Sequence, residues 1–449
     1  MKKIQQIENA VKKYRNLVEN TEQFLWTHPE LGYKEWAAST YLMQEFEHLG
    51  YQVQSAGDIP GFIADLDTGR PGPRIAIMGE LDSLICETHP DANPTTKAVH
   101  ACGHHCQGTI LLGCAAVCKE KWALEGLCGS VRFVAVPAEE TIDAEYRKQL
   151  IENGIIHYLA GKIEFLYRGY LDDVDLAILI HTGTFTEHLF ELPTGYDGCI
   201  IKHFEYQGVA AHAGGAPHLG INALYAASLG LNAINALRET FCEKDYVRVH
   251  PIITQAGVAA NAIPELAKLD SYVRAATLDG MKNINNKVNR ALAATAAAMG
   301  ANVVIQDSPG NMPFHADILF MHEFEQCVEE WFGKNQVVKI PWRTETSDVG
   351  DISTIMPMIQ PLCAGASGIQ HGDNYHITDL EKACINPIKV LVLLVNHLLE
   401  KEASCANRII DEYRPVFSGK EAYFQTIDGL KKEWTAVAYH EDGNIELRI

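Results

Sequence analysis

The sequence predicts an α/β protein, in which a mainly parallel-sheet domain carries a second, α+β domain inserted into it. Short apolar strands alternate with helical segments at both ends of the chain, a pattern typical of a parallel sheet covered on both faces. The middle third has a different pattern, with four strand-like runs and two helices. At 449 residues, the chain is also too long for one compact core, so two domains are expected.

The first part of the chain supplies the alternation of strands and helices. An amphipathic helix is expected at the N-terminus, and a helix near 35–49 ends at Gly50, a residue type that commonly terminates helices. Two more helices are expected, one from Gly108 through LLGCAAVCKEKW and one near 143–160. The expected strands are YQVQS at 51, RIAIMG at 74, VRFVAV at 131 and DLAILI at 175.

The middle third resembles a compact α+β sandwich of about a hundred residues. Its expected helices are INALYAASLGLNAINALRE and GMKNINNKVNRALAATAAAMG. Its expected strands are CIIKHFEYQG at 199, VRVHPIITQAG at 247, LAKLDSYVRAAT at 266 and ANVVIQD at 301. The α/β pattern resumes after Pro313 and ends in a buried helix near 386–400. We therefore expect an α/β domain in two parts, 1–197 and 311–402, an inserted domain at 198–310, and an extension of unassigned role at 403–449.

Composition narrows the function classes. The formal net charge is −20, from 57 acidic and 37 basic residues, which argues against nucleic-acid binding because a phosphate backbone needs a basic face. The N-terminus has no apolar signal region, and the apolar run VLVLLV is too short to span a bilayer. We therefore expect a cytoplasmic protein without membrane partners, whose twelve cysteines are free thiols.

The stretch HACGHHCQGT at 100–109 concentrates histidine and cysteine. Cys102 and His104 are two residues apart, and this spacing fits no structural zinc-finger pattern. Other polar residues directly follow predicted strands: Glu80 and Asp82 after one, and His181 after another. In open α/β sheets, ligands bind at the carboxyl ends of strands, so these segments are expected to converge on one site.

The stretch VPAEE at 136–140 adds two adjacent carboxylates, Glu139 and Glu140, at a strand end. Neighbouring side chains there point in different directions, so one glutamate can bind a metal while the other faces a water molecule. Two metals about 3.5–4 Å apart can activate a water that a carboxylate deprotonates. Thiolate and imidazole ligands favour zinc, while manganese or cobalt also fit. Apart from Cys102 and His104, each residue alone is more typical of a structural role; the order and placement of all of them together favour a metal centre.

The order of the motifs also carries a family resemblance over about residues 20–400. The motifs are HPELGYKE (28), GELDSL (79), HACGHHCQGT (100), PAEE (137), GVAAHAGGAPHLGINA (208), NAIPELAKLDSYVRA (261), SDVGDIS (347) and the segment around His371. In this order the chain resembles the aminoacylase and carboxypeptidase G-like family of metal-dependent amidohydrolases and peptidases. It is most similar to the branch of hippurate, auxin-conjugate and p-aminobenzoyl-glutamate hydrolases.

The resemblance implies a zinc-peptidase-like catalytic domain that holds two divalent metal ions, and an inserted lid domain that forms a homodimer. It implies a substrate with a free carboxylate, such as an N-acyl amino acid or a short peptide. For the last metal ligand, His376 is the alternative to His371. The implied metal ligands are Cys102, His104, Glu140, His181 and His371.

The resemblance also implies the residues that act on the substrate. Glu139 matches the general base, and Asp82 is placed to orient a ligand from behind the metals. His212 resembles a lid histidine that reaches the partner's site and stabilises an oxyanion. Asn261 and Arg274 resemble lid residues that hold the substrate carboxylate. The expected reaction is hydrolysis of an amide bond by a metal-activated water.

The sequence departs from the family pattern in two places. His105 stands where an acidic or amide residue usually follows the CGH element, and GELDSLI lacks the usual proline. Three alternatives therefore stay open: a dipeptidase or carboxypeptidase with the same centre, a cysteine hydrolase with Cys102 as nucleophile, and a non-catalytic scaffold. Two points argue against the cysteine hydrolase. Cys102 and His104 are two residues apart and can meet only in unusual backbone, and the PAEE pair would have no role.

Overall fold

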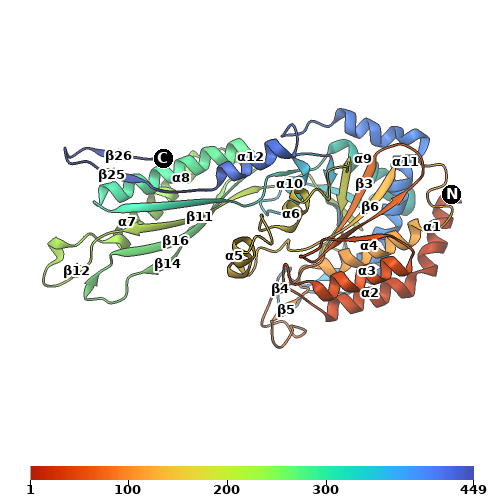
Figure 1. Cartoon of the computed structure of the whole chain (residues 1–449), viewed down its shortest axis with the longest axis horizontal. Coiled ribbons are helices and arrows are strands. Elements are labelled where there is room, and N and C mark those ends of the chain that lie inside the picture. The colour runs from red at the N-terminus through yellow and green to blue at the C-terminus, as the bar shows by residue number, and fades with distance from the viewer. Residues whose placement is uncertain (1) are drawn as a thin grey trace. The chain divides into compact units, whose positions relative to one another are not determined.

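The computed structural model describes residues 2–449, which form two compact units (Figure 1). Unit 1 comprises Met1–Thr194, His315–Trp342 and Asp351–Val416. Unit 2 comprises Gly195–Phe314, Arg343–Gly350 and Phe417–Ile449. Compared with the ranges expected from the sequence, residues 343–350 group with the inserted part, and the expected extension at 403–449 is divided between the units.

Unit 1 is built on a six-stranded sheet with the order β1-β2-β6-β3-β7-β20. The central strands β6, β3 and β7 run parallel, as does the β7–β20 pair, whereas β1 and β2 are antiparallel additions at one edge. Both faces of the central strands are buried, which explains their continuous apolar runs. The strands are β1 (Val53–Ser55), β2 (Phe62–Asp67), β3 (Arg74–Glu80), β6 (Ser130–Val136), β7 (Leu176–Leu179) and β20 (Met358–Ile359).

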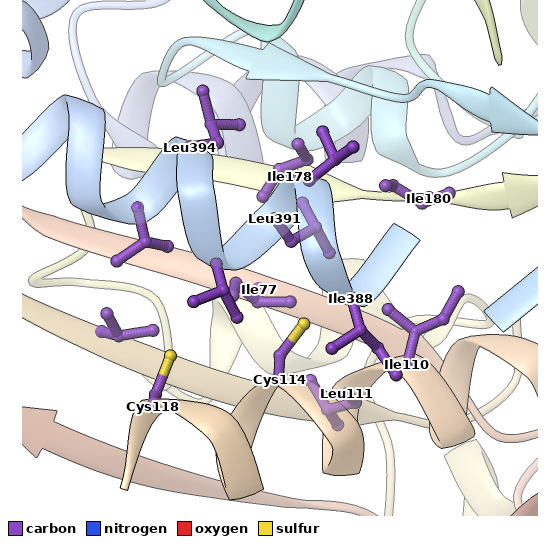
Figure 2. Close-up of a cluster of buried hydrophobic side chains, with 14 of the residues drawn as sticks. Ile77, Ile110, Leu111, Cys114, Cys118, Ile178, Ile180, Ile388, Leu391 and Leu394 are labelled. Atoms are coloured by element: carbon purple, nitrogen blue, oxygen red, sulfur yellow. The ribbon is translucent and has the colours of Figure 1, made fainter. Parts of the chain in front are cut away.

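Helices from both ends of the chain pack on this sheet. Figure 2 shows α4 and α11 against β3 and β7, where Leu391 of α11 and Cys114 of α4 meet Ile77 and Ile178 of the strands. Every residue of α4 is buried, so this helix lies at the centre of the unit. The helices of unit 1 are α1 (Lys2–Lys13), α2 (Arg15–Thr27), α3 (Trp36–His48), α4 (His104–Cys118), α5 (Ala144–Glu152), α6 (Gly161–Tyr167), α9 (Ile318–Phe332), α10 (Val349–Ser353, which begins in unit 2) and α11 (Asn386–Glu412).

Side-chain caps fix where several helices begin. Asp143, Asn222, Thr277 and Asp317 each accept a hydrogen bond from a backbone N–H in the first turn of the helix that follows. The carboxylate of Glu30 does the same for α3, since it accepts from the N–H groups of Ala37 and Ala38. These contacts satisfy backbone N–H groups that would otherwise lack a partner in the first turn of each helix.

Helix α11 and the preceding turn, Glu381–Glu412, are long and apolar enough to cross a membrane by length and composition alone. However, 89% of the most apolar window is buried inside the structure, as expected for a core helix. The helix is also broken near its C-terminal end, where Lys401, Glu402 and Ala403 adopt left-handed backbone angles.

Smaller strands complete unit 1. A four-stranded sheet has the order β19-β9-β21-β8, and two hairpin-like pairs join β4 to β5 and β22 to β23. These strands are β4 (Leu84–Ile85), β5 (Ala98–Val99), β8 (His181–Thr182), β9 (Phe190–Pro193), β19 (Val337–Ile340), β21 (Leu362–Cys363), β22 (Ala366–Ser367) and β23 (His376–Ile377).

Unit 2 is an antiparallel sheet packed against two helices, α7 (Ala223–Leu237) and α8 (Leu278–Ala298). The sheet has the order β13-β16-β11-β17-β24, and β14 also pairs with β16. Strand β16 alternates between buried and half-buried residues, as a sheet covered on one face requires. The strands are β11 (Gly198–Gln207), β12 (Ala211–His212), β13 (Arg248–Val249), β14 (Ile252–Ala256), β15 (Ala262–Ile263), β16 (Leu266–Ala275), β17 (Asn302–Pro309) and β24 (Lys432–Thr435).

The C-terminal residues 417–449 are an integral part of unit 2. Strand β24 pairs with β17 and covers that edge of the sheet, while α12 (Lys420–Leu430) contacts β17. A final hairpin of β25 (Val437–Tyr439) and β26 (Ile445–Leu447) lies beside α8 (Figure 1). The tail therefore adds a strand that the expected four-strand sandwich did not include.

The structure corrects three expected elements. Helix α4 begins at His104 and not near Gly108, because Gly103 adopts a left-handed angle (φ 91°) that starts the helix directly after Cys102. The helix expected near 143–160 ends early, at Glu152, and residues 153–160 form a turn before α6 begins at Gly161. The strand expected at 247 is divided into β13 and β14 at His250–Pro251, where proline removes a backbone donor.

We expect Leu391→Ala to destabilise unit 1 by about 2–5 kcal/mol, because the side chain is almost fully buried between α4 and the sheet and its removal leaves a cavity. Ile318→Ala, at a position that is 78% exposed, is the matched control. Urea unfolding of both variants measures the difference; equal midpoints would contradict the packing described here.

Candidate metal centre

The carboxyl ends of the three central strands form one edge of the sheet in unit 1. Strand β3 ends at Glu80 and β6 at Val136, and their register is parallel, so the residues that follow them lie side by side. Asp82 follows β3, the pair Glu139 and Glu140 follows β6, and His181 follows β7. The convergence expected from the sequence is therefore present in the structure.

The loop before α4 brings Cys102 and His104 to the same edge. Gly103 lies so close to Thr182 and Tyr375 that a Cβ atom at this position would overlap their hydroxyl groups. Those two hydroxyls are hydrogen-bonded to each other at 2.7 Å. Only glycine fits both the left-handed backbone and this contact, which is how HACGH is held beside the segment of His181.

The five expected ligands and Glu139 form overlapping groups of three. In each group, the potential ligand atoms all lie within 4.8 Å of one another. Ligand atoms about 2.0–2.3 Å from one ion can be at most about 4.6 Å apart, so this spacing is close to that of ion-binding sites. The groups are Cys102 with His104 and His181, Cys102 with Glu140 and His371, and His104 with Glu139 and Glu140.

Cys102 and Glu140 connect these groups. The Sγ atom of Cys102 lies 3.4 Å from Nε2 of His181, and Oε1 of Glu140 lies 3.1 Å from Nε2 of His371. Because Cys102 belongs to two groups and Glu140 to two, the arrangement has the form of a centre for two ions that share ligands. His376, the alternative to His371, is exposed and belongs to none of these groups.

The chemistry of the donors fits a divalent metal. Oε1 of Glu140 is buried without a hydrogen-bond partner, although His371 lies close to it. Burial opposes ionisation of Glu140, but His371 and His104 hold the pKa of its carboxyl group below the ordinary value. Burial raises the pKa of the Cys102 thiol, which a coordinated cation would reverse because thiol ligands bind as thiolates.

Asp82 orients two of these ligands from behind. Its Oδ1 lies 3.0 Å from Nδ1 of His104, and its Oδ2 accepts a hydrogen bond from the backbone N–H of Glu140 at 2.8 Å. The carboxylate is fully buried. A proton on Nδ1 of His104 leaves Nε2 free to bind a metal, the arrangement common among histidine ligands.

A second buried carboxylate, Glu80, also contacts His104. The sequence did not identify its other two partners, Gln107 and Lys162. Its Oε2 lies 3.1 Å from Nε2 of His104 and accepts from Nε2 of Gln107 at 2.7 Å, while Lys162 forms an ion pair with Oε1. Burial opposes ionisation, but Lys162 and His104 lower the pKa of Glu80 to about 2. Lys162 had no sequence signal because it lies inside the otherwise ordinary helix α6.

His105 lies outside the ligand groups. Its ring packs against Trp26 with centroids 4.9 Å apart, and its Nε2 lies 3.4 Å from a carboxylate oxygen of Glu22. Burial lowers the pKa of His105. The acidic partner of His105 is thus Glu22, on α2. The departure from the family pattern does not separate the five expected ligands.

In unit 2, His212 and Asn261 lie together. The backbone N–H of Ala213 donates to the carbonyl oxygen of Asn261 at 2.9 Å, and β12 pairs with β15. Nδ1 of His212 accepts from the N–H groups of Gly214 and Gly215, at 3.2 and 2.8 Å. In the neutral ring the proton is therefore on Nε2, which makes this exposed histidine a hydrogen-bond donor.

Arg274 is held apart from these two residues. It lies at the end of β16, opposite Cys199, whereas His212 and Asn261 lie beyond the start of that strand. Arg274 is eight residues from Leu266, the first residue of β16, and eight residues of extended strand span about 26 Å. The guanidinium stacks on Tyr272 and donates to the carbonyl oxygen of Thr344, but its buried Nε has no hydrogen-bond partner.

The chain is similar to known proteins in sequence and in fold. Residues 195–299 match the family described as "Peptidase dimerisation domain". One of the chains that form the p-aminobenzoyl-glutamate hydrolase of Escherichia coli is 31% identical over 66% of this chain and 59% of its own length. The human Xaa-Arg dipeptidase is 27% identical over 78% of this chain and 77% of its own. The chain thus spans somewhat more than half of the first relative.

The same fold occurs in a solved structure of a dinuclear metal-binding peptidase of the M20 family from Bacillus subtilis. It has a TM-score of 0.68 and 19% identity, covering 86% of this chain and 99% of that one. This likeness confirms the predicted fold class. In sequence the chain is similar to p-aminobenzoyl-glutamate hydrolase and Xaa-Arg dipeptidase chains, and residues 195–299 match a peptidase dimerisation domain, so the predicted resemblance is confirmed.

We expect Asp82→Asn to weaken metal binding by about 10–100-fold, because the amide replaces one of the two acceptor oxygens with a donor, while His104 and Glu140 together need both oxygens. Asp411→Asn, at an exposed position on α11, is the matched control. Zinc titration against a competing chelator measures both affinities. If the two variants bind zinc equally, Asp82 does not orient the ligands.

Proposed function

We propose that the chain is a metal-dependent amidohydrolase that cleaves the amide bond of N-acyl amino acids or similar amides with a carboxylate. The observation that carries this proposal is the convergence of one thiol, three imidazoles and two glutamates at the strand ends of unit 1. Such a mixed set suits two divalent ions, zinc by ligand softness, with manganese or cobalt as alternatives. When bound, the ions would supply Lewis acidity and lower the pKa of water.

Glu139 is the proposed general base. Its carboxylate lies within 4.8 Å of the ligand atoms of His104 and Glu140, yet its side chain is only half-buried. It can therefore take a proton from the attacking water and deliver that proton to the leaving amine. Ala138, directly before it, has a positive φ of 59° and is fully buried, so strained backbone fixes the direction in which the glutamate pair points.

His212 is the proposed donor to the oxyanion, and we propose that it acts on the partner's site in a homodimer. The hydrogen bonds from Gly214 and Gly215 place its proton on the exposed Nε2, as an oxyanion donor requires. Asn261, beside it, and Arg274, at the other end of β16, are the proposed contacts to the substrate carboxylate.

Unit 2 offers a surface for this dimer. Among residues 2–449, β14 pairs only with β16, so its other edge carries unpaired backbone groups. Two apolar side chains of β14, Ile252 and Ile253, are exposed. A second copy pairing along β14 would cover this edge and these side chains together.

A dipeptidase is the second candidate, since the relative with the longest alignment described above is named Xaa-Arg dipeptidase. The same residues would then act on a peptide bond. A non-catalytic scaffold ranks lower, because the ligand groups and Glu139 are all in place. A cytoplasmic location stays part of the proposal.

We expect Glu139→Gln to lower kcat by at least about 100-fold, because the amide cannot accept the proton of water. The variant should keep the metal content of the unmodified protein, since Glu140 and the other ligands are unchanged. Hydrolysis of N-acyl amino acids and of dipeptides, measured beside elemental analysis, tests both statements. Glu145→Gln, on the exposed face of α5, is the control. Substantial activity in Glu139→Gln would exclude the assigned role.

A mixture of protomers tests whether His212 acts across the dimer. A heterodimer of His212→Ala and Glu139→Gln chains should contain one complete site, because the first chain keeps Glu139 and receives His212 from the second. Neither homodimer has such a site. We therefore expect activity only in the purified heterodimer, separated by two affinity tags. Inactivity of a verified heterodimer would place His212 in its own chain's site.

A further inference from the structure

A second cluster of histidine, cysteine and glutamate lies in unit 1, apart from the candidate centre and built from other elements. Glu323 is on α9, while His397 and Cys405 are on the two sides of the break in α11. One ligand atom of each residue lies within 4.8 Å of the other two. The proposed hydrolytic reaction uses none of these residues.

Glu323 is the centre of this cluster. Its side chain is 5% exposed, and its Oε2 lies 2.8 Å from Nε2 of His397. Its other oxygen, Oε1, lies 2.5 Å from Nη2 of Arg408. His397 is one-third exposed and Cys405 is half-buried, so an ion can reach the cluster from solvent.

The break in α11 creates the cluster. His397 and Cys405 are eight residues apart, and in a continuous helix they would lie about 12 Å apart along the axis. Instead, Lys401, Glu402 and Ala403 have φ values of 51°, 59° and 56°, the left-handed region that residues with a Cβ rarely adopt. This kink changes the direction of the chain, so that His397 and Cys405 both lie close to Glu323.

We propose that Glu323, His397 and Cys405 bind one divalent transition metal ion that ties the two parts of α11 to α9. Thiolate, imidazole and carboxylate are the three ligand types that zinc uses, and water can complete a tetrahedral set. On binding, the thiol of Cys405 releases its proton to solvent. The thiolate and the carboxylate then offset both charges of the ion, while Arg408 stays on the second oxygen of Glu323.

The charged groups around the cluster are compatible with a cation. Glu400 lies 3.9 Å from Nδ1 of His397 and is itself paired with Lys401. Arg408 is half exposed and can move with Glu323. Without an ion, Glu323 and Arg408 alone would brace the break, and this purely ionic brace is the competing interpretation that the test must exclude.

Cadmium binding to the full chain distinguishes the two interpretations, since a cadmium–thiolate bond gives a strong ultraviolet absorption band. Cys102→Ser removes the only thiol of the candidate hydrolytic centre. In this background we expect a band that Cys405→Ser abolishes and that His397→Gln weakens at least about tenfold in cadmium affinity. Cys242→Ser, at an exposed cysteine in unit 2, is the matched control and should leave the band unchanged.

Zinc should also raise the thermal midpoint of Cys102→Ser by more than that of Cys102→Ser/His397→Gln. This comparison remains available if Cys405→Ser does not fold. A cadmium band that survives Cys405→Ser, or a midpoint that zinc raises equally with and without His397, would overturn the proposal in favour of the ionic brace. If the candidate hydrolytic centre bound no metal, only the difference between Cys102→Ser and the unmodified chain would change. The comparisons made within the Cys102→Ser background would stay the same.

Discussion

The buried carboxylate of Asp82 is the interaction on which the candidate centre depends. One oxygen holds the ring of His104 at the start of α4, and the other holds the backbone of Glu140 after β6. Asp82 itself follows β3. Three elements from separate parts of the sequence thus meet at one side chain. Because a buried charge without partners is costly, the fold around it must supply these donors, which fixes the positions of the ligands relative to one another.

Much of this arrangement could be predicted from the sequence, because it depends on local patterns. Continuous apolar runs identified β3, β6 and β7, and the polar residues that follow each run lie at one edge for the simple reason that the strands are parallel. The structure places Cys102, His104, Glu140, His181 and His371 in shared groups, as the motif order implied. Their roles in binding and catalysis stay predictions.

Other features depend on contacts between distant residues, which no local pattern reveals. Lys162 reaches Glu80 from a helix that begins some eighty positions later, and the early start of α4 depends on the packing of Gly103 against Thr182 and Tyr375. The break in α11 interrupts a sequence with good helical periodicity, so periodicity alone predicts a continuous helix. In each case tertiary packing overrides the local preference.

The C-terminal strand β24 has a consequence for how copies of this chain can associate. A sheet with two open edges can add neighbours on both sides without limit, as fibrils do. In unit 2, the strand at the β17 edge is β24, which is only four residues long and carries Lys432 and Glu433. Short, charged edge strands resist pairing with another chain, whereas β14 at the other edge carries the exposed side chains of Ile252 and Ile253. Strand addition is therefore favoured at β14 alone, and two copies that met there would leave only their protected β24 edges. The tail would thereby direct such association toward a closed pair.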